Sequence, residues 1–274
     1  MLAARANPAE LWQRGACLKL HRVAGLGEVS MTASAVLTRG KQPTPVAGTA
    51  CAISYLRIGG PPYSARAASS RGGARNLASR ETYALSPAHV GNLIAAVRHA
   101  DAIGMPFTRM ITVHWQSAGV ELDGMTNATG KFLDMLSKAL ARRGSATAYL
   151  WVHENGHGKG GHCHILAHVP AALVSTVGRL QMRWLRTITG RPYRARVIRS
   201  DPIGGRLGLE ASNPALHRIN TAVALGYVLK GASEHAAEIF ELARLEPGGR
   251  CIGKRCGVSQ NIGAKARATA RIDK

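Results

Sequence analysis

The feature that most constrains the fold is a pair of apolar segments separated by the glycine-rich stretch NGHGKGG, residues 155–161. The flanking segments, 147–154 and 162–169, have the length and apolar content of strands. Glycines permit the tight return that pairs two consecutive strands. Side chains on a strand alternate between its two faces, so the register of the pair decides which residues meet. The stretch therefore predicts an antiparallel hairpin inside a sheet.

Helices and further strands alternate irregularly around this hairpin. Ser86 and Pro87 are typical of a helix start, and apolar residues at helical spacing follow as far as Gly104. The other expected helices cover 129–142, the segment that Pro170 opens, 220–230 and 233–244, and the other expected strands cover 107–115 and 194–200. This order favours an α+β fold with a mainly antiparallel sheet over a doubly wound parallel one.

Composition divides the chain into three parts. Residues 1–78 are rich in Gly, Pro, Ser and Arg and predict a flexible basic extension, 79–245 predict the structured domain, and 246–274 predict a basic C-terminal tail. The chain has 36 Lys and Arg against 15 Asp and Glu, a formal net charge of +21. Such an excess favours nucleic acid as the partner over an anionic membrane. The tail residues expected to contact DNA backbone are Lys254, Arg255, Lys265 and Arg267.

The cysteines and the hydropathy pattern bear on the compartment. Five cysteines without regular spacing do not predict a disulfide framework, so we expect a reducing compartment. Cys251 and Cys256 could ligate zinc, but no second Cys/His pair of suitable spacing follows, and ordinary thiols are the expectation. The chain contains no run of about 18 apolar residues. Its first residues lack the apolar core of a secretion signal, so we expect a cytoplasmic protein without a membrane partner.

The sequence HCH places two histidines on one face of the hairpin. His162 and His164 are two residues apart on the expected strand, so they point the same way while Cys163 points to the buried face. If the hairpin is centred on Gly158, Glu154 lies directly across from His162 and shares its face. Two imidazoles and one carboxylate suit Mn²⁺ and could accept Mg²⁺.

This metal site depends on the assumed register. A slip by one residue would turn Glu154 to the other face, and His157 or His114 would then be the substitute ligand. A half-buried strand that merely exposes histidines remains the alternative. With the assumed register, His153, His157 and His168 are expected to be bystanders.

A second feature lies in the stretch ALGYVLKGAS, residues 224–233. Tyr227 and Lys230 are three apart on an expected helix and would share a face. A tyrosine beside a cation can attack phosphorus while the cation offsets charge on the phosphate and a metal ion polarises the same group. A lysine packed along a tyrosine is common without such a role, so the significance lies in the combination with the hairpin.

Three stretches together resemble the ordered motifs of the HUH endonucleases: ITVHW (111–115), ENGHGKGGHCHIL (154–166) and YVLK (227–230). The likeness is greatest to the rolling-circle replication initiators of plasmids and filamentous phages, and it covers roughly residues 105–232. The stretch IGKRCGVSQNIG, 252–263, also resembles the end of a branch of these initiators. The resemblance implies a ferredoxin-like or RRM-like core, with the metal hairpin in the middle of an antiparallel sheet and helices on its flanks.

By motif position, the resemblance implies a role for each site residue. His162 and His164 would be the paired metal ligands and Glu154 the third, Tyr227 the nucleophile and Lys230 its phosphate-orienting partner. The implied reaction is attack on single-stranded origin DNA, which leaves a 5′-phosphotyrosine and a free 3′-OH. The chain has no GxxxxGK[ST] sequence, so a host helicase and the replication machinery of a bacterial cell are the implied partners.

Three other functions remain open. Conjugative relaxases usually place the tyrosine before the histidine motif, whereas here it follows. Single-tyrosine transposases share the motif order but are usually shorter, and strand transfer to a second site would reveal one. In a non-catalytic nucleic-acid-binding protein the histidines would be structural, and a chelator would change nothing.

Overall fold

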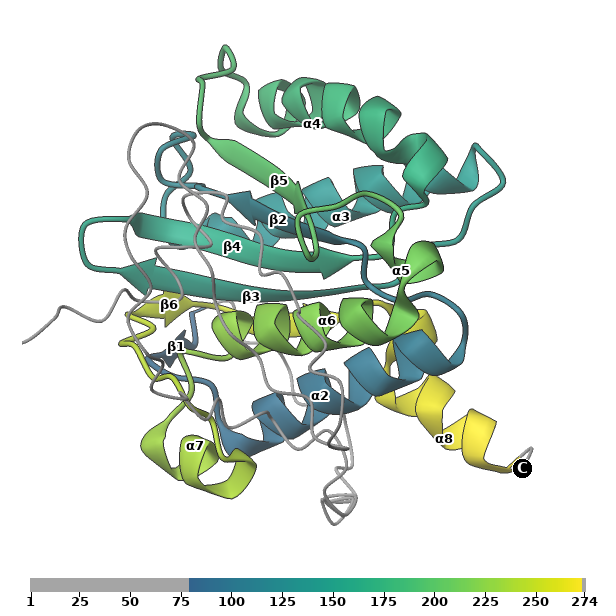
Figure 1. Cartoon of the computed structure of the whole chain (residues 1–274). Helices are drawn as coiled ribbons and strands as arrows, with labels where there is room; N and C mark the ends of the chain where they lie inside the picture. Colours follow the sequence, from purple (N-terminus) through teal and green to yellow (C-terminus); the bar gives the residue numbers. More distant parts are fainter. Residues whose placement is uncertain (1–78, 273–274) are drawn as a thin grey trace, which may run out of the picture. The chain divides into compact units, whose positions relative to one another are not determined.

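The computed structural model describes residues 79–272. Its centre is a five-stranded sheet in the order β5-β2-β4-β3-β7, in which every neighbouring pair is antiparallel (Figure 1). These strands are β2 (Arg109–Val113), β3 (Tyr149–Gly156), β4 (Gly160–Ala167), β5 (Ile198–Pro202) and β7 (Cys256–Val258). A separate short pair joins β1 (Glu81–Thr82) to β6 (Cys251–Ile252). The expected α+β class with an antiparallel sheet is confirmed.

Helices cover both faces of this sheet (Figure 1). On one face lie α3 (Met125–Ala141) and α4 (Val174–Thr189), which pack against each other, and on the other lie α2 (Pro87–Ala102) and α6 (Pro214–Val228). The smaller elements are η1 (Ala171–Leu173), α5 (Leu209–Ser212), α7 (Glu234–Phe240), η2 (Gln260–Ile262) and α8 (Ala264–Ile272). Within residues 79–272, no helix combines the length and the apolar character that crossing a membrane requires.

Because side chains alternate along each strand, the two faces of the sheet carry different residues. Ile165 and Cys163 of β4 belong to the apolar core under α3 and α4, together with Phe132 of α3 and Trp184 of α4. The residue between them, His164, consequently points to the opposite face, on the side of α6. The prediction that Cys163 lies on the core side is confirmed, because its fully buried side chain belongs to this apolar core.

Local signals located several element ends correctly. Ser86 caps α2 by accepting a hydrogen bond from the His89 backbone N–H, and Pro87 is the first helical residue. The last predicted strand begins late, at Ile198, because Arg196 adopts a positive φ of 67° that interrupts extended backbone. The helix that starts after Ser233 stops at Phe240 rather than at residue 244.

The extent of α6 differs from the expectation of a helix over 220–230. It begins at Pro214, where the Asn213 side chain accepts a hydrogen bond from the Leu216 backbone N–H. It ends at Val228, and Leu229 is its C-cap. Lys230 therefore lies in the turn that follows the helix, and the expectation that it continues the helix is wrong.

The expected basic tail is part of the fold as far as Ile272. Strand β7 pairs with β3, with Cys256 opposite Val152, and β6 pairs with β1. This backbone pairing holds the segment against the sheet, and three of its side chains are buried: Cys251, Cys256 and Ile262. Its glycine-rich, basic composition gave no sign of these pairings. The extension predicted for residues 1–78 lies outside the described residues.

Candidate metal centre

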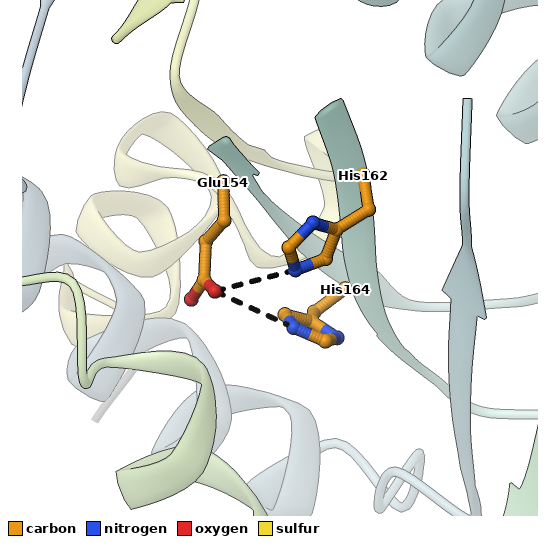
Figure 2. Close-up of side chains that lie close together, drawn as sticks. All are labelled: Glu154, His162 and His164. Carbon is orange, nitrogen blue, oxygen red and sulfur yellow. Dashed lines mark ion pairs between the residues drawn. The ribbon is translucent and has the colours of Figure 1, made fainter. Parts of the chain in front are cut away.

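The hairpin of β3 and β4 has the register that the candidate metal site requires. Glu154 pairs directly with His162, and the pairing closes at Gly156 opposite Gly160, so the turn is centred on Gly158. Gly158 and Gly160 have φ of +76° and +63°, a backbone conformation that favours glycine. Glu154, His162 and His164 therefore project from the same face (Figure 2).

These three side chains form one compact, buried group. His162 Nε2 is 3.4 Å from Glu154 Oε2, and His164 Nε2 is 3.7 Å from the same oxygen (Figure 2). One candidate ligand atom from each residue lies within 4.8 Å of the others. Each of the three residues is at most 3% exposed. Among the residues that the structure describes, this is the one group of three or more His, Cys, Asp or Glu that could hold a metal ion.

The outer contacts of the two imidazoles leave Nε2 available to an ion. His162 Nδ1 is 2.8 Å from the carbonyl oxygen of Gly160, which can only accept, so Nδ1 carries the proton and Nε2 a lone pair. His164 Nδ1 is 3.0 Å from the hydroxyl oxygen of Thr112, its cross-strand neighbour on β2. A hydrogen bond from the second ring nitrogen is typical of metal-ligating histidines.

Two atoms of the group are buried without a hydrogen-bond partner: His164 Nε2 and Glu154 Oε1. Leaving a buried polar atom unpaired costs about 1–3 kcal/mol, so such atoms usually mark an ion, a water molecule or a functional strain. Both atoms are suitable ligands for a divalent cation. The residues present therefore fit a metal ion.

The charges of the group also suit a cation. Burial alone raises the pKa of Glu154, but the close imidazoles of His162 and His164 and the charge of Lys230 outweigh it, so the net pKa is well below its usual range. Burial lowers the pKa of His164 to about 4. The group therefore presents a carboxylate and a neutral imidazole at pH 7, which are the protonation states that metal binding needs.

Lys230 reaches the same carboxylate from the turn after α6. Its ammonium group forms an ion pair with Glu154 Oε2 and is 3.8 Å from Glu246 Oε2. The side chain is 4% exposed, so the pair is almost fully buried. Although Lys230 is not on the helix, its Nζ lies 4.8 Å from the centre of the Tyr227 ring. The structure thus brings Tyr227 and Lys230 together, by a turn instead of a shared helical face.

Tyr227, in the last turn of α6, lies next to the group formed by Glu154, His162 and His164. Its ring packs edge-on against His164, with 5.1 Å between the ring centres. The guanidinium of Arg244 lies 5.4 Å from the centre of the Tyr227 ring and is itself paired with Glu246. Sequence reasoning missed Arg244 and Glu246, because only the folding back of the loop after α7 brings them to α6.

The remaining histidines have other surroundings. His153 lies on the opposite face of β3, where its Nδ1 donates to the carbonyl of Lys254 and its Nε2 contacts the Thr129 hydroxyl. Burial lowers the pKa of His153 to about 3, so it is a neutral structural residue. His157 is exposed in the turn. The His114 ring lies 5.4 Å from that of His162, and burial lowers its pKa.

The four residues expected to contact DNA fall into two pairs. Lys254 and Lys265 are exposed. Arg255 is 2% exposed and donates from Nη1 to the carbonyls of Thr82 and Gly249, so the expectation of a phosphate contact is corrected. Arg267 is half-buried and donates to the Asn92 side chain, which joins α8 to α2. Cys251 and Cys256 are free buried thiols.

No family model, no curated protein and no solved structure matches this chain. The interpretation of the site therefore rests on the residues that form it. They are a buried carboxylate and two imidazoles with their second nitrogens engaged, next to a tyrosine between two cations.

Proposed function

We propose that this protein is a metal-dependent endonuclease that nicks single-stranded DNA through Tyr227. The observation that carries the proposal is the contact between the Tyr227 ring and His164 of the buried metal group. The two residues come from different elements and are more than sixty positions apart in the chain. A nucleophile beside a metal-type group and two cations is the arrangement that phosphoryl transfer requires.

The proposed reaction conserves the number of phosphate ester bonds. A divalent cation, Mn²⁺ or Mg²⁺, held by Glu154, His162 and His164 would supply Lewis acidity at the scissile phosphate. The Tyr227 oxygen loses its proton and forms a bond to phosphorus, while the bond from phosphorus to the 3′ oxygen breaks and that oxygen takes up a proton. The products are a 5′-phosphotyrosine and a free 3′-OH, so rejoining needs no ATP.

Lys230 and Arg244 would offset the negative charge that develops in this reaction. Both place a cationic group within 6 Å of the Tyr227 ring centre, where it can offset negative charge on the attacking oxygen and on the phosphate. Lys230 also pairs with Glu154, so it connects the nucleophile with the proposed metal ligand.

The proposal extends to the fold family and the biological role. A histidine hairpin in the middle of an antiparallel sheet with helices on both faces is compatible with the ferredoxin-like HUH fold. The formal net charge of +21 supports a nucleic-acid substrate. We extend the proposal to initiation of rolling-circle replication, with a host helicase as partner, because the motif order resembles that of the replication initiators.

The test is covalent capture of single-stranded DNA. A random-sequence oligonucleotide pool, labelled at the 3′ end, is incubated with the protein and Mn²⁺ and resolved on a denaturing gel. Because the 5′-phosphate side becomes attached, labelled DNA should migrate with the protein. Tyr227→Phe should abolish this adduct, as should a chelator, while Tyr83→Phe, at a 63% exposed tyrosine, should retain it. An adduct of undiminished yield with Tyr227→Phe would refute the assignment.

A non-catalytic nucleic-acid-binding protein is the second candidate, and one observation favours it. The ion pair between Lys230 and Glu154 already neutralises the carboxylate that the metal would need. In that case Mn²⁺ would not change the unfolding temperature, and a chelator would leave DNA binding unaltered. A covalent adduct that depends on Tyr227 rules it out.

A further inference from the structure

Helix α4 exposes a row of arginines on the face that points away from the core. Arg179, Arg183 and Arg186 are three or four residues apart and are all exposed. Val177 and Trp184, on the other side of the helix, are buried in the core. Because residues at this spacing share a helical face, the three guanidinium groups form one stripe.

The stripe borders a surface groove. The groove is lined by the three arginines, Met182, Arg191 and Tyr193, with Gly190 and Pro192 at the turn. Gly190 ends α4 with a φ of 65°, which turns the chain so that Arg191 and Tyr193 return alongside the helix. Met182 is 42% exposed, so the groove offers apolar surface as well as charge.

The charge of this region is uncompensated. Residues 155–200 contain no Asp or Glu. Within residues 79–272, none of the ion pairs involves Arg179, Arg183 or Arg186. Several like charges held together by one helix are unfavourable unless a polyanion neutralises them. The groove is therefore built for an anionic polymer.

The form of the groove points to a single strand of nucleic acid. With a rise of about 1.5 Å per residue, Arg179 and Arg186 are about 10 Å apart along the helix. This distance is longer than the spacing of neighbouring phosphates in a strand, so the stripe can contact more than one phosphate. Tyr193 supplies an aromatic ring on which an unpaired base can stack and Met182 an apolar surface beside it, whereas a duplex would keep its bases away from both. Basic side chains interleaved with an aromatic residue are typical of single-strand binding.

We propose that the groove formed by α4 and the loop after it binds single-stranded DNA at a site separate from the nicking centre. Figure 1 shows α4 and α6 on opposite sides of the sheet, so the strand held here is not the segment at Tyr227. The choice of DNA rests on the proposed function; the groove itself does not depend on nicking. A second contact of this kind would keep the strand attached after cleavage.

The test measures binding without cleavage. All variants carry Tyr227→Phe, chelator is present, and a labelled oligothymidylate is titrated at several salt concentrations by fluorescence anisotropy. Replacing Arg179, Arg183 and Arg186 together with Gln should weaken binding at least tenfold at low salt. The slope of log K against log salt should become shallower by about 2, since each lost phosphate contact contributes about 0.7.

A charge-matched control separates the groove from the general charge. Lys131, Arg142 and Arg206 are exposed and lie outside the groove, so their combined replacement with Gln removes the same charge and should change affinity less than threefold. Tyr193→Ala should weaken binding roughly fivefold to a hundredfold through lost stacking, and Tyr193→Phe should retain it.

Three results would overturn the proposal: equal losses in the two triple variants, an unchanged salt slope in the groove variant, or a loss confined to duplex DNA. Circular dichroism checks that each variant is folded. Failure of the nicking proposal would give a different result: the covalent-capture test would yield no adduct through Tyr227, while replacing the groove arginines would still weaken binding.

Discussion

The ion pair between Glu154 and Lys230 makes a quantitative prediction about stability. Both side chains are 4% exposed, so Glu154→Gln leaves an ammonium group buried without its nearest counter-charge. Removing one partner of a buried pair costs about 3–5 kcal/mol. Glu246, 3.8 Å from the same ammonium and 38% exposed, remains as a partial substitute. We therefore expect a loss near the lower end, about 3 kcal/mol.

The assay is thermal and denaturant unfolding in the presence of chelator, so that metal binding does not contribute. For a domain of this size, a loss of about 3 kcal/mol corresponds to a fall in unfolding temperature of about 6–12 °C. Glu238→Gln is the matched control, because that side chain is exposed, and it should change stability by less than about 0.5 kcal/mol.

A double variant identifies the cause of the loss. Glu154→Gln combined with Lys230→Met removes both charges and should recover most of the stability, because the isolated buried charge is gone. The reasoning would be refuted by a Glu154→Gln protein within about 1 kcal/mol of the parent, or by a double variant no more stable than Glu154→Gln alone.

Three further predictions concern the metal, pH and the nucleophile. Mn²⁺ at about 100 times its dissociation constant should stabilise the protein by about 2.7 kcal/mol; His162→Ala should abolish this shift, and His157→Ala, in the exposed turn, should keep it. Burial lowers the pKa of His153 to about 3, so as the pH falls the unfolded chain takes up a proton on this residue before the folded chain does. The free energy of unfolding should therefore decline as the pH falls from about 6.5 toward 3. His153→Gln should flatten that part of a curve of unfolding free energy against pH. Arg244→Gln should slow adduct formation about tenfold or more, measured as the rate at which labelled DNA becomes attached to the protein, because it removes a cation that offsets negative charge beside the Tyr227 ring.

Much of the fold class follows from local patterns. The glycine-rich turn and the apolar segments around it predicted the hairpin, and its pairing of Glu154 with His162 is confirmed. Turn geometry and strand alternation suffice for this result, because they act over a few neighbouring residues. The capping of α2 by Ser86 is a signal of the same kind.

The surroundings of the candidate site were only partly predictable. The motif spacing indicated Tyr227 and Lys230, but not that the helix ends at Val228 and that a turn carries Lys230 to Glu154. Arg244 and Glu246 belong to no motif, since their position depends on how the chain returns after α7.

The sequence by itself determined which residues share a face of the central hairpin, because side-chain alternation is a property of every strand. Only the tertiary structure decided what meets that face: Tyr227 against His164, Lys230 on Glu154, and a C-terminal segment that buries Arg255 and pairs β7 with β3. Such contacts join residues that are distant in the chain. They form when many surfaces are buried together, so the spacing of neighbouring residues in the sequence does not predict them.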